Sequence, residues 1–239
     1  GNGSYLVNTN VTFNVNGVFY TRKTNNSGVA KLNINLIPGN YILTVYNPYN
    51  GEEKAFNLTI KSLIVENHDL TKYYRNSSQF SVKVLNNQGY PAIHENVTFN
   101  INGVFYTRCS DNNGYVSLSI MLLPGDYIVT IFFNDDSTSN WIHVLPTLVT
   151  HDLIMNYMDG SKFRAKVLDS QGKPSCNKKV SFNVNGVFYN RTTDNYGIAR
   201  LNIRLMQGNY IITSICDDYQ IGNKIVIGDN LNSTYENYF

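Results

Sequence analysis

Residues 11–22 read VTFNVNGVFYTR, and nearly the same stretch returns as VTFNINGVFYTR at residues 97–108 and as VSFNVNGVFYNR at residues 180–191. In each copy an Asn-Gly pair separates two runs in which apolar and polar residues alternate. Asn-Gly between alternating runs is the strongest short-range signal for a two-residue type I′ hairpin, because both turn residues must accept a positive φ. The stretch therefore predicts a β-hairpin that recurs along the chain.

The position of the turn fixes which side chains share a face of this hairpin. In the first copy one face is expected to carry Val11, Phe13, Val15, Val18, Tyr20 and Arg22. The other face then carries Phe19 among Thr and Asn side chains, with Phe105 and Phe188 at the same position of the later copies. Phe19, Phe105 and Phe188 are therefore candidate contact residues. The alternative, which the sequence favours, is that a second sheet or an adjoining domain covers them.

The rest of each copy also alternates with period two, which is typical of strands. After the hairpin come AKLNINL, VSLSIML or ARLNIRL, and then a segment containing Tyr41, Tyr127 or Tyr210 two residues after a glycine. Those tyrosines resemble the tyrosine corner of Greek-key sandwiches. Copies two and three are preceded by two further predicted strands, which gives about seven strands each. The fold class is therefore predicted as all-β, with tandem immunoglobulin-like (Greek-key) β-sandwich domains, the first of them incomplete.

The repeat also predicts the domain boundaries. We expect a partial Ig-like repeat at 1–60 that lacks its first strands, Ig-like repeats at 61–145 and 146–228, and a C-terminal tail at 229–239. In the first copy, GNGSYLVN is aligned with the strand RNSSQFSV and supplies at best a stunted second strand. A sandwich without an edge strand exposes unpaired backbone. One hypothesis is therefore that a strand from a neighbouring molecule completes the first repeat, with the tail DNLNSTYENYF as the spare segment.

Composition argues against several classes of partner. Only 15% of the 239 residues are charged and the formal net charge is +2, so the sequence gives no electrostatic case for nucleic acid or an anionic membrane. No apolar run approaches the roughly 18–20 residues that cross a bilayer, so no membrane contact is expected within this chain.

The three cysteines occupy no common repeat position, which excludes a recurring disulfide framework. Pairing of Cys176 with Cys216 remains open.

A second set of recurrent residues carries charge. Arg22, Arg108 and Arg191 share one position in the three copies, and Asp69 and Asp152 share another in the two full ones. We predict that they form a structural clamp, by salt bridges or hydrogen bonds, at the edge of the sandwich; a ligand-binding arginine is the alternative. No metal site, cofactor or catalytic set is expected, because neither the spacing of His, Cys and acids nor any nucleophile motif fits one. The chain is predicted not to be an enzyme.

The repeat, with its strings DLTKYY, FxxKVLxxxGxP, DNxGxAxL and PGNYIIT, resembles the Ig-like repeats of adhesin-like surface proteins from methanogenic archaea, and more widely bacterial Ig-like and transthyretin-like surface modules. The resemblance covers nearly the whole chain. It implies an extracellular, cell-surface array that serves adhesion or spacing, without catalytic residues. Short linkers near residues 60 and 145 predict a semi-rigid rod.

The ligand stays open. We expect an unknown surface ligand, glycan or protein, and self-association is a further option. Two alternative functions remain: a filament subunit that assembles by strand exchange at the incomplete first repeat, and an accessory carbohydrate-binding region of a secreted enzyme.

Overall fold

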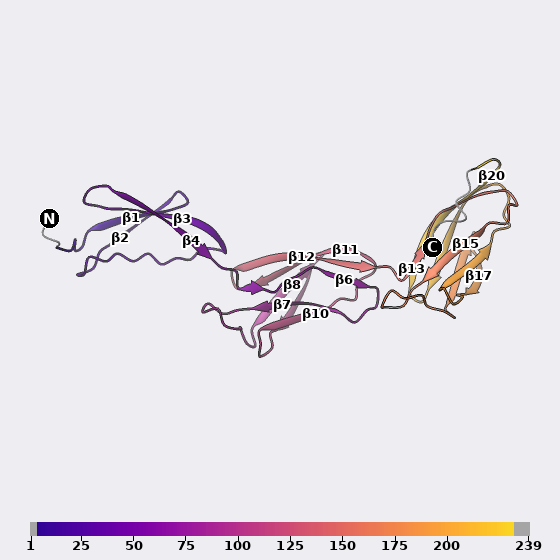
Figure 1. Cartoon of the computed structure of the whole chain (residues 1–239), viewed down its shortest axis with the longest axis horizontal. Coiled ribbons are helices and arrows are strands. Elements are labelled where there is room, and N and C mark those ends of the chain that lie inside the picture. Colours follow the sequence, from indigo (N-terminus) through magenta and orange to yellow (C-terminus); the bar gives the residue numbers. More distant parts are fainter. Residues whose placement is uncertain (1–3, 232–239) are drawn as a thin grey trace.

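The computed structural model describes residues 4–231, which form only strands, turns and irregular segments. The strands build three modules that follow one another along the length of the molecule (Figure 1). Module 1 contains β1 to β4, module 2 contains β5 to β12, and module 3 contains β13 to β20. The sequence prediction of an all-β chain of tandem Ig-like sandwiches is confirmed by this arrangement.

Module 2 consists of two facing sheets. One has the strand order β10-β7-β5 and the other β6-β12-β11-β8-β9, with β6 parallel to β12 and all other neighbours antiparallel. Its strands are β5 (Ile64–Val65), β6 (Leu70–Tyr73), β7 (Gln79–Val84), β8 (Asn96–Ile101), β9 (Val104–Cys109), β10 (Tyr115–Ser119), β11 (Gly125–Phe133) and β12 (Asp136–Leu145). The chain changes sheet at every connection of this module except β8–β9 and β11–β12. This is the Greek-key wiring of an Ig-like sandwich.

Module 3 repeats this arrangement with sheets β13-β15-β18 and β14-β20-β19-β16-β17. Its strands are β13 (Leu148–Thr150), β14 (Leu153–Asn156), β15 (Lys162–Val167), β16 (Lys179–Val184), β17 (Val187–Thr192), β18 (Ile198–Asn202), β19 (Gly208–Cys216) and β20 (Tyr219–Gly228). Modules 2 and 3 each have two sheets, and the strand order is the same in both modules. Equivalent positions of the two modules can therefore be compared directly.

Module 1 has a single sheet in the described residues, with the order β2-β1-β3-β4. Its strands are β1 (Asn10–Val15), β2 (Val18–Lys23), β3 (Gly39–Tyr46) and β4 (Glu53–Ile60). They correspond to β8, β9, β11 and β12 of module 2. The sheet that faces the long sheet in modules 2 and 3 therefore has no counterpart among the described residues of module 1.

The hairpin of residues 11–22 has the register that the sequence predicts. Val15 pairs with Val18, Phe13 with Tyr20, and Val11 with Arg22. Asn16 and Gly17 have φ values of 47° and 89°, so both turn residues lie in the left-handed region that a type I′ turn requires.

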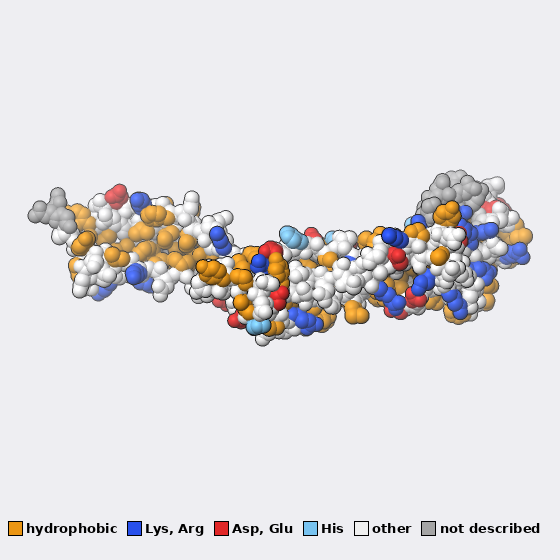
Figure 2. Space-filling view, turned by 60° about the horizontal axis from the view of Figure 1, so that its bottom comes forward, with side chains coloured by type: hydrophobic (Ala, Val, Ile, Leu, Met, Phe, Trp, Pro, Cys, Tyr) orange, Lys and Arg blue, Asp and Glu red, His pale blue; other side chains and the backbone are white. Residues whose placement is uncertain are grey.

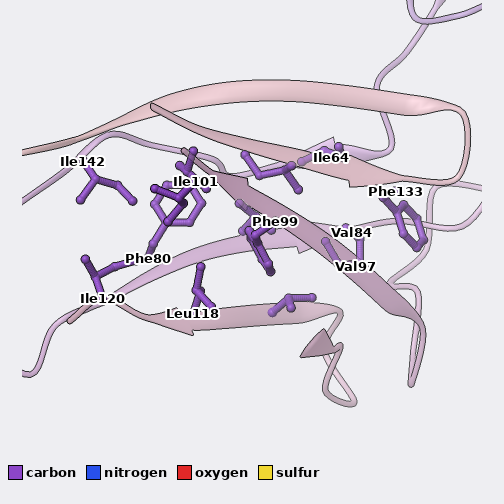
Figure 3. Close-up of a cluster of buried hydrophobic side chains, with 14 of the residues drawn as sticks. Ile64, Phe80, Val84, Val97, Phe99, Ile101, Leu118, Ile120, Phe133 and Ile142 are labelled. Carbon is purple, nitrogen blue, oxygen red and sulfur yellow. The ribbon is translucent and has the colours of Figure 1, made fainter. Parts of the chain in front are cut away.

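The core of module 2 is formed by alternate residues of both sheets, as the period-two pattern requires (Figure 3). Phe80 on β7 and Phe99 on β8 meet edge to face across the sandwich, with their ring centroids 6.2 Å apart. Both rings are almost completely buried. Phe163 and Phe182 make the same contact in module 3, at 5.8 Å. Burial of a phenylalanine side chain contributes about 2–3 kcal/mol, so this pair is a main reason why the two sheets stay together.

The tyrosine corner is confirmed in all three modules. The hydroxyl of Tyr127 donates to the carbonyl of Leu123, 2.8 Å away, and ties the connection before β11 to that strand. The hydroxyls of Tyr41 and Tyr210 donate to the carbonyls four residues before them at 2.7 Å and 2.9 Å. The bond in module 1 forms although the described part of that module has a single sheet, because donor and acceptor are local in sequence.

Two predictions for the first repeat are wrong. The segment AKLNINL, expected as a strand with Ala30, Leu32, Ile34 and Leu36 in the core, forms no strand. Its equivalents β10 and β18 each pair with only one neighbour, β7 or β15, and module 1 has no such neighbour in the described residues. A strand needs a partner for its backbone groups, so the alternating pattern alone is not sufficient.

The alignment of GNGSYLVN with a second strand is also wrong. Thr24 Oγ1 donates to the carbonyl of Leu6, just as Ser110 Oγ donates to the carbonyl of Ala92 in module 2. Leu6 therefore corresponds to Ala92, which lies in the loop before β8, and not to a residue of β7. The tail DNLNSTYENYF begins within the described residues, but residues 232–239 lie outside them, so the prediction that it donates a strand is not tested.

The end of β6 joins module 2 to module 3. Tyr74 Oη donates to Asp218 at 3.1 Å, Arg75 lies 2.8 Å from the same carboxylate, and Asn76 Nδ2 donates to the carbonyl of Ser170 at 2.7 Å. The Tyr74 ring also lies 5.7 Å from the ring of Tyr219. These contacts connect one end of module 2 with the β19–β20 turn and a neighbouring loop of module 3.

Candidate functional site

The outer face of the long sheet carries the same four residue types in every module. We call this set the outer patch; it consists of Phe and Asn from the hairpin and Thr and Ile from the following strand. In module 1 it is Phe19, Asn14, Thr44 and Ile42. In module 2 it is Phe105, Asn100, Thr130 and Ile128. In module 3 it is Phe188, Asn183, Thr213 and Ile211.

The sheet register places the residues of the outer patch side by side. In module 2, Asn100 pairs with Phe105 on one side and with Thr130 on the other, so the three form a row across β9, β8 and β11. Ile128 lies two residues from Thr130 on the same face of β11, beside the hairpin turn. Cross-strand neighbours of this kind are about 4.5–5.5 Å apart at Cβ, which makes the patch one continuous surface.

The aromatic rings of the patch are exposed. Phe19, Phe105 and Phe188 have 61%, 63% and 58% of their surface accessible. Within residues 4–231 neither a second sheet nor an adjoining module covers them, so the packing alternative is wrong. Their role as contact residues remains a prediction.

The asparagine of the patch holds the hairpin turn in place. Its Oδ1 accepts the N–H of the turn glycine, at 2.7 Å from Asn14 to Gly17 and 3.1 Å from Asn100 to Gly103. Asn183 does the same in module 3. This bond fixes the side-chain amide beside the phenylalanine and explains why the patch returns with the same geometry.

The residue opposite the isoleucine on the last long strand differs between modules. Ile42 lies opposite Asn57, Ile128 opposite Trp141, and Ile211 opposite Lys224. The patch is therefore extended by an amide in module 1, by an aromatic ring in module 2 and by a cation in module 3.

Module 2 has the largest aromatic surface of this kind. Trp141 is 46% exposed and stacks on His143, with ring centroids 5.9 Å apart and planes 12° apart. His143 Nδ1 and Asp126 Oδ1 are separated by 2.7 Å. Phe132 is exposed on the same face of the neighbouring strand β11. The imidazole is held between a carboxylate and the indole, which keeps the indole plane in a fixed orientation.

The isoleucines and Trp141 were not identified from the sequence as contact residues. The signal was present, because alternation puts Ile42, Ile128 and Ile211 on the face opposite their buried neighbours. This signal is obscured by the consecutive apolar residues around the isoleucines. Such a run is equally typical of a strand that is buried on both faces. Only the strand pairing shows that nothing covers the outer face.

The predicted arginine and aspartate clamp residues are not brought together. Arg22 and Arg108 each donate an Nη1 hydrogen to the carbonyl of the preceding residue, Thr21 or Thr107, at 2.8 Å. Arg191 does so at 2.7 Å. All three lie on an edge strand, β2, β9 or β17, at the far side of the sheet from β6 and β14.

The aspartates clamp the opposite edge. Asp69 Oδ1 accepts the backbone N–H of Trp141 at 2.8 Å and an Nδ2 hydrogen of Asn140 at 3.2 Å. The backbone hydrogen bond from Trp141 is the main reason why the pKa of Asp69 is below its ordinary value. Asp152 makes the equivalent bonds to Lys224 and Asn223, and its pKa is lowered for the same reason. Each carboxylate therefore fixes the start of the parallel strand, β6 or β14, to the strand beside it.

Other candidate chemistry is sparse. Within residues 4–231 no group of three or more His, Cys, Asp or Glu side chains is arranged to hold a metal ion. Cys109, Cys176 and Cys216 are all free thiols, and the first two are exposed. The same described range contains no helix with the length and apolar character needed to span a bilayer.

Comparison with known proteins gives similarity only at the level of structure. No protein-family model matches the sequence, and no curated protein does. The chain is similar to the crystal structure of the I9-I11 tandem of titin, with 16% identity and a TM-score of 0.37 over 93% of this chain and 89% of that one. It is also similar to a bacterial ice-binding adhesin described for host cell surface retention, with 14% identity and a TM-score of 0.24 over 92% and 86%.

A further similar structure is invasin, a bacterial integrin-binding protein. It is 17% identical, with a TM-score of 0.30, over 72% of this chain and 40% of that one. Identities and TM-scores of this size say nothing about the ligand or activity of the present chain.

Proposed function

We propose that this chain is part of a non-enzymatic cell-surface protein of the adhesin or stalk type, in which Ig-like modules in series form a semi-rigid rod that displays a repeated contact surface. The observation that carries the proposal is the outer patch, which recurs at one position in every module and is exposed each time. A repeated surface on a serial scaffold multiplies weak contacts. A catalyst instead needs one set of converging reactive groups.

The joint between modules 2 and 3 supports the rod. Hydrogen bonds from Tyr74 and Asn76 and the ion pair of Arg75 reach two separate points of module 3, the carboxylate of Asp218 and the carbonyl of Ser170. Contacts at two separate points restrict the bending of one module against the other more than a single contact would. The linker itself is short, since β12 ends at Leu145 and β13 begins at Leu148.

The chemistry of the outer patch supports an uncharged contact. It combines an aromatic ring and an isoleucine with one amide and one hydroxyl, and the patch residues themselves carry no charge. Exposed aromatic residues beside hydrogen-bonding groups are typical of recognition surfaces. The sequence resemblance to Ig-like repeats of adhesin-like archaeal surface proteins supports an extracellular location for that contact, with a glycan or protein on another surface as its target.

The contact role is tested by replacing Phe19, Phe105 and Phe188 with serine, singly and together. Beads coated with the parent chain or a variant are incubated with a neutral glycan array and with immobilised extracellular proteins. We expect capture by the parent, a modest loss for each single variant and a disproportionate loss for the triple variant, because the contacts act together. The melting temperature should change little, since the rings are exposed.

Phe99→Ser provides the opposite control. This ring lies at the equivalent depth on the inner face and is fully buried, so the variant should lose stability before any binding is measured. Equal capture by the parent and the folded triple variant would refute the contact role of the outer patch.

A further inference from the structure

The second strand of the hairpin forms a free edge of the long sheet. In residues 4–231, β9 of module 2 and β17 of module 3 are the last strands of their sheets and pair with one neighbour each. Both have six residues, whereas the other edge strands of these two modules have two to five. Five of the six residues are exposed in each. A long exposed edge strand is a template on which a strand of another chain can pair.

The register of the hairpin shows which backbone groups of this edge are free. After a two-residue turn, the first residue of β9 is hydrogen-bonded to β8, and every second residue then follows it. Tyr106 and Arg108 are of this kind. Phe105 and Thr107 therefore direct their N–H and C=O groups away from the sheet, and Thr107 does so in the middle of the free edge.

An arginine side chain covers this outward carbonyl in every module. The Nη1 to O distances are 2.8 Å, 2.8 Å and 2.7 Å for the bonds from Arg22 to Thr21, from Arg108 to Thr107 and from Arg191 to Asn190. Arg108 lies opposite Val97, which is completely buried, so its side chain starts toward the inner face. It reaches the carbonyl by turning around the edge of the sheet.

The overall charge of the chain does not keep such edges apart. The formal net charge is only +2, which gives weak repulsion between copies. Figure 2 shows basic side chains on the visible face of each module, interspersed with hydrophobic and uncharged surface. Protection of the edge therefore has to be local.

We propose that Arg22, Arg108 and Arg191 are edge guards, which prevent a second copy of this chain from pairing with the same strand of the first. Such pairing would be antiparallel and two-fold symmetric, with each copy offering the same edge. The arginine opposes it in two ways. Its bond already satisfies the outward carbonyl, and its guanidinium occupies the space where the second strand would lie.

The guards matter more because the edge recurs. Several equal edges on one chain would let copies link into larger assemblies once the edges were open. Phe105 lies on the same strand as Arg108, so paired edges would also restrict access to the outer patch. The edge guards give the recurrent arginines a role that does not depend on the ligand of that patch.

The first test is a triple variant, Arg22→Ser with Arg108→Ser and Arg191→Ser, studied by sedimentation velocity over a series of concentrations. The parent should remain monomeric where the variant forms dimers and larger species. The midpoint concentration of association should be at least about tenfold lower for the variant, because three edges open together.

The matched control removes the same charge elsewhere. Lys31, Lys61 and Lys173 are exposed, one in each module or at its start, and none of them lies on an edge strand of the hairpin. Their triple serine variant should sediment as the parent does.

Amide hydrogen exchange locates the contact. In the associated arginine variant the outward N–H groups of Phe105 and Thr107 should gain protection. The N–H of Tyr106 should not change, since it already bonds to β8.

Proline provides a rescue that is specific for edge pairing. Thr21→Pro, Thr107→Pro and Asn190→Pro remove an outward N–H from each edge without removing a bond to the neighbouring strand. Added to the arginine variant, these changes should restore the monomer. Circular dichroism melting of both variants shows that they are folded, and misfolding would produce association that proline does not reverse.

Several results would overturn the proposal. They are an arginine variant that stays as monomeric as the parent, a parent that associates equally strongly, a lysine control that associates like the arginine variant, and association that persists after the proline changes. Association that is abolished by serine at Phe19, Phe105 and Phe188 would assign it to the outer patch and would overturn the proposal as well.

Discussion

At the scale of single residues, recurrent side chains keep one structural role while their partners change. Asp69 and Asp152 hold the N–H of a tryptophan in one module and of a lysine in the other, and both use the same oxygen. The two modules therefore share the backbone N–H that donates to the aspartate. The side chain of the donating residue differs between them. This freedom is the physical basis for a different outer surface on each module.

We predict a pH-dependent loss of stability for Asp152→Ala. The pKa of Asp152 is lowered from 3.8 in the folded state, so its contribution is fully present above that value and is lost as pH falls through the folded pKa. At neutral pH the free energy of unfolding of module 3 should fall by roughly 0.5–1 kcal/mol.

The measurement is urea unfolding over a series of pH values from neutral downward, in which the difference between parent and variant should shrink as the pH falls through the lowered pKa of Asp152. Asp152→Asn keeps a side-chain oxygen that can accept the backbone N–H of Lys224. This variant should therefore lose less stability than the alanine variant. A difference between parent and Asp152→Ala that persists at low pH would contradict this assignment.

Gly172 and Gly89 allow a matched test of the joint. Their φ values are 78° and 84°, so an alanine costs about 1 kcal/mol of backbone strain at either position. Only at Gly172 would the new methyl group meet a ring, that of Tyr73. Gly172→Ala should therefore also open the joint between modules 2 and 3.

Small-angle scattering should show a broader distribution of dimensions for Gly172→Ala and an unchanged one for Gly89→Ala. The same scattering profile for both variants would mean that Tyr73 and Gly172 do not determine the angle between the modules.

At the scale of the element, a hairpin and a single sandwich strand differ in where their pairing partner lies in the sequence. The hairpin of residues 11–22 forms in module 1 with its full register because its partner strand is the next one in sequence. Residues 29–36 carry an equally regular pattern and remain irregular, because their partner would come from a part of the fold that lies far away in sequence. A local pattern thus specifies a hairpin, whereas it specifies a sandwich strand only together with its neighbour.

This difference can be measured as hydrogen exchange. Amides of residues 29–36 should exchange on the order of 100-fold faster, or more, than those of residues 115–119 and 198–202, because they have no ladder to protect them. Amides of β1 and β3 should be slow by comparison, since both strands lie inside their sheet. Equal protection of the three equivalent segments would show that the first one is paired in solution.

At the scale of the whole molecule, the modules are similar in sequence and unequal in structure. Modules 2 and 3 each have a two-layer core and share a joint that several side chains hold together. Among residues 4–231, module 1 has one layer, and no strand there supplies the equivalent contacts to module 2. The joint between modules 2 and 3 is therefore expected to be a stiff part of the rod.

Module 1 should unfold first on heating. Trp141, the single tryptophan of the chain, lies in module 2, so its fluorescence reports that module alone, whereas circular dichroism reports all three. We expect circular dichroism to show an early transition that the fluorescence does not follow, because a single layer buries less apolar surface. Coincident transitions by both probes would mean that module 1 is as stable as the others.

The sequence by itself determined whatever depends on neighbouring residues. The hairpins with their register, the tyrosine corners and the outward direction of Phe19 follow from turn chemistry and from alternation over a few residues. The exposed isoleucines and the pairing of Trp141 with Ile128 required knowledge of which strands lie next to each other.

Only the tertiary structure decided how the parts complete one another. It showed that the arginines and aspartates lie at opposite edges of the sheet, that Leu6 belongs to a loop, and that residues 29–36 do not become a strand. The physical reason is the same in each case. Backbone N–H and C=O groups form hydrogen bonds with strands that are distant in the chain, and apolar faces are covered by such strands. A periodic sequence therefore predicts what kind of strand can pair with it, but not whether that strand is present.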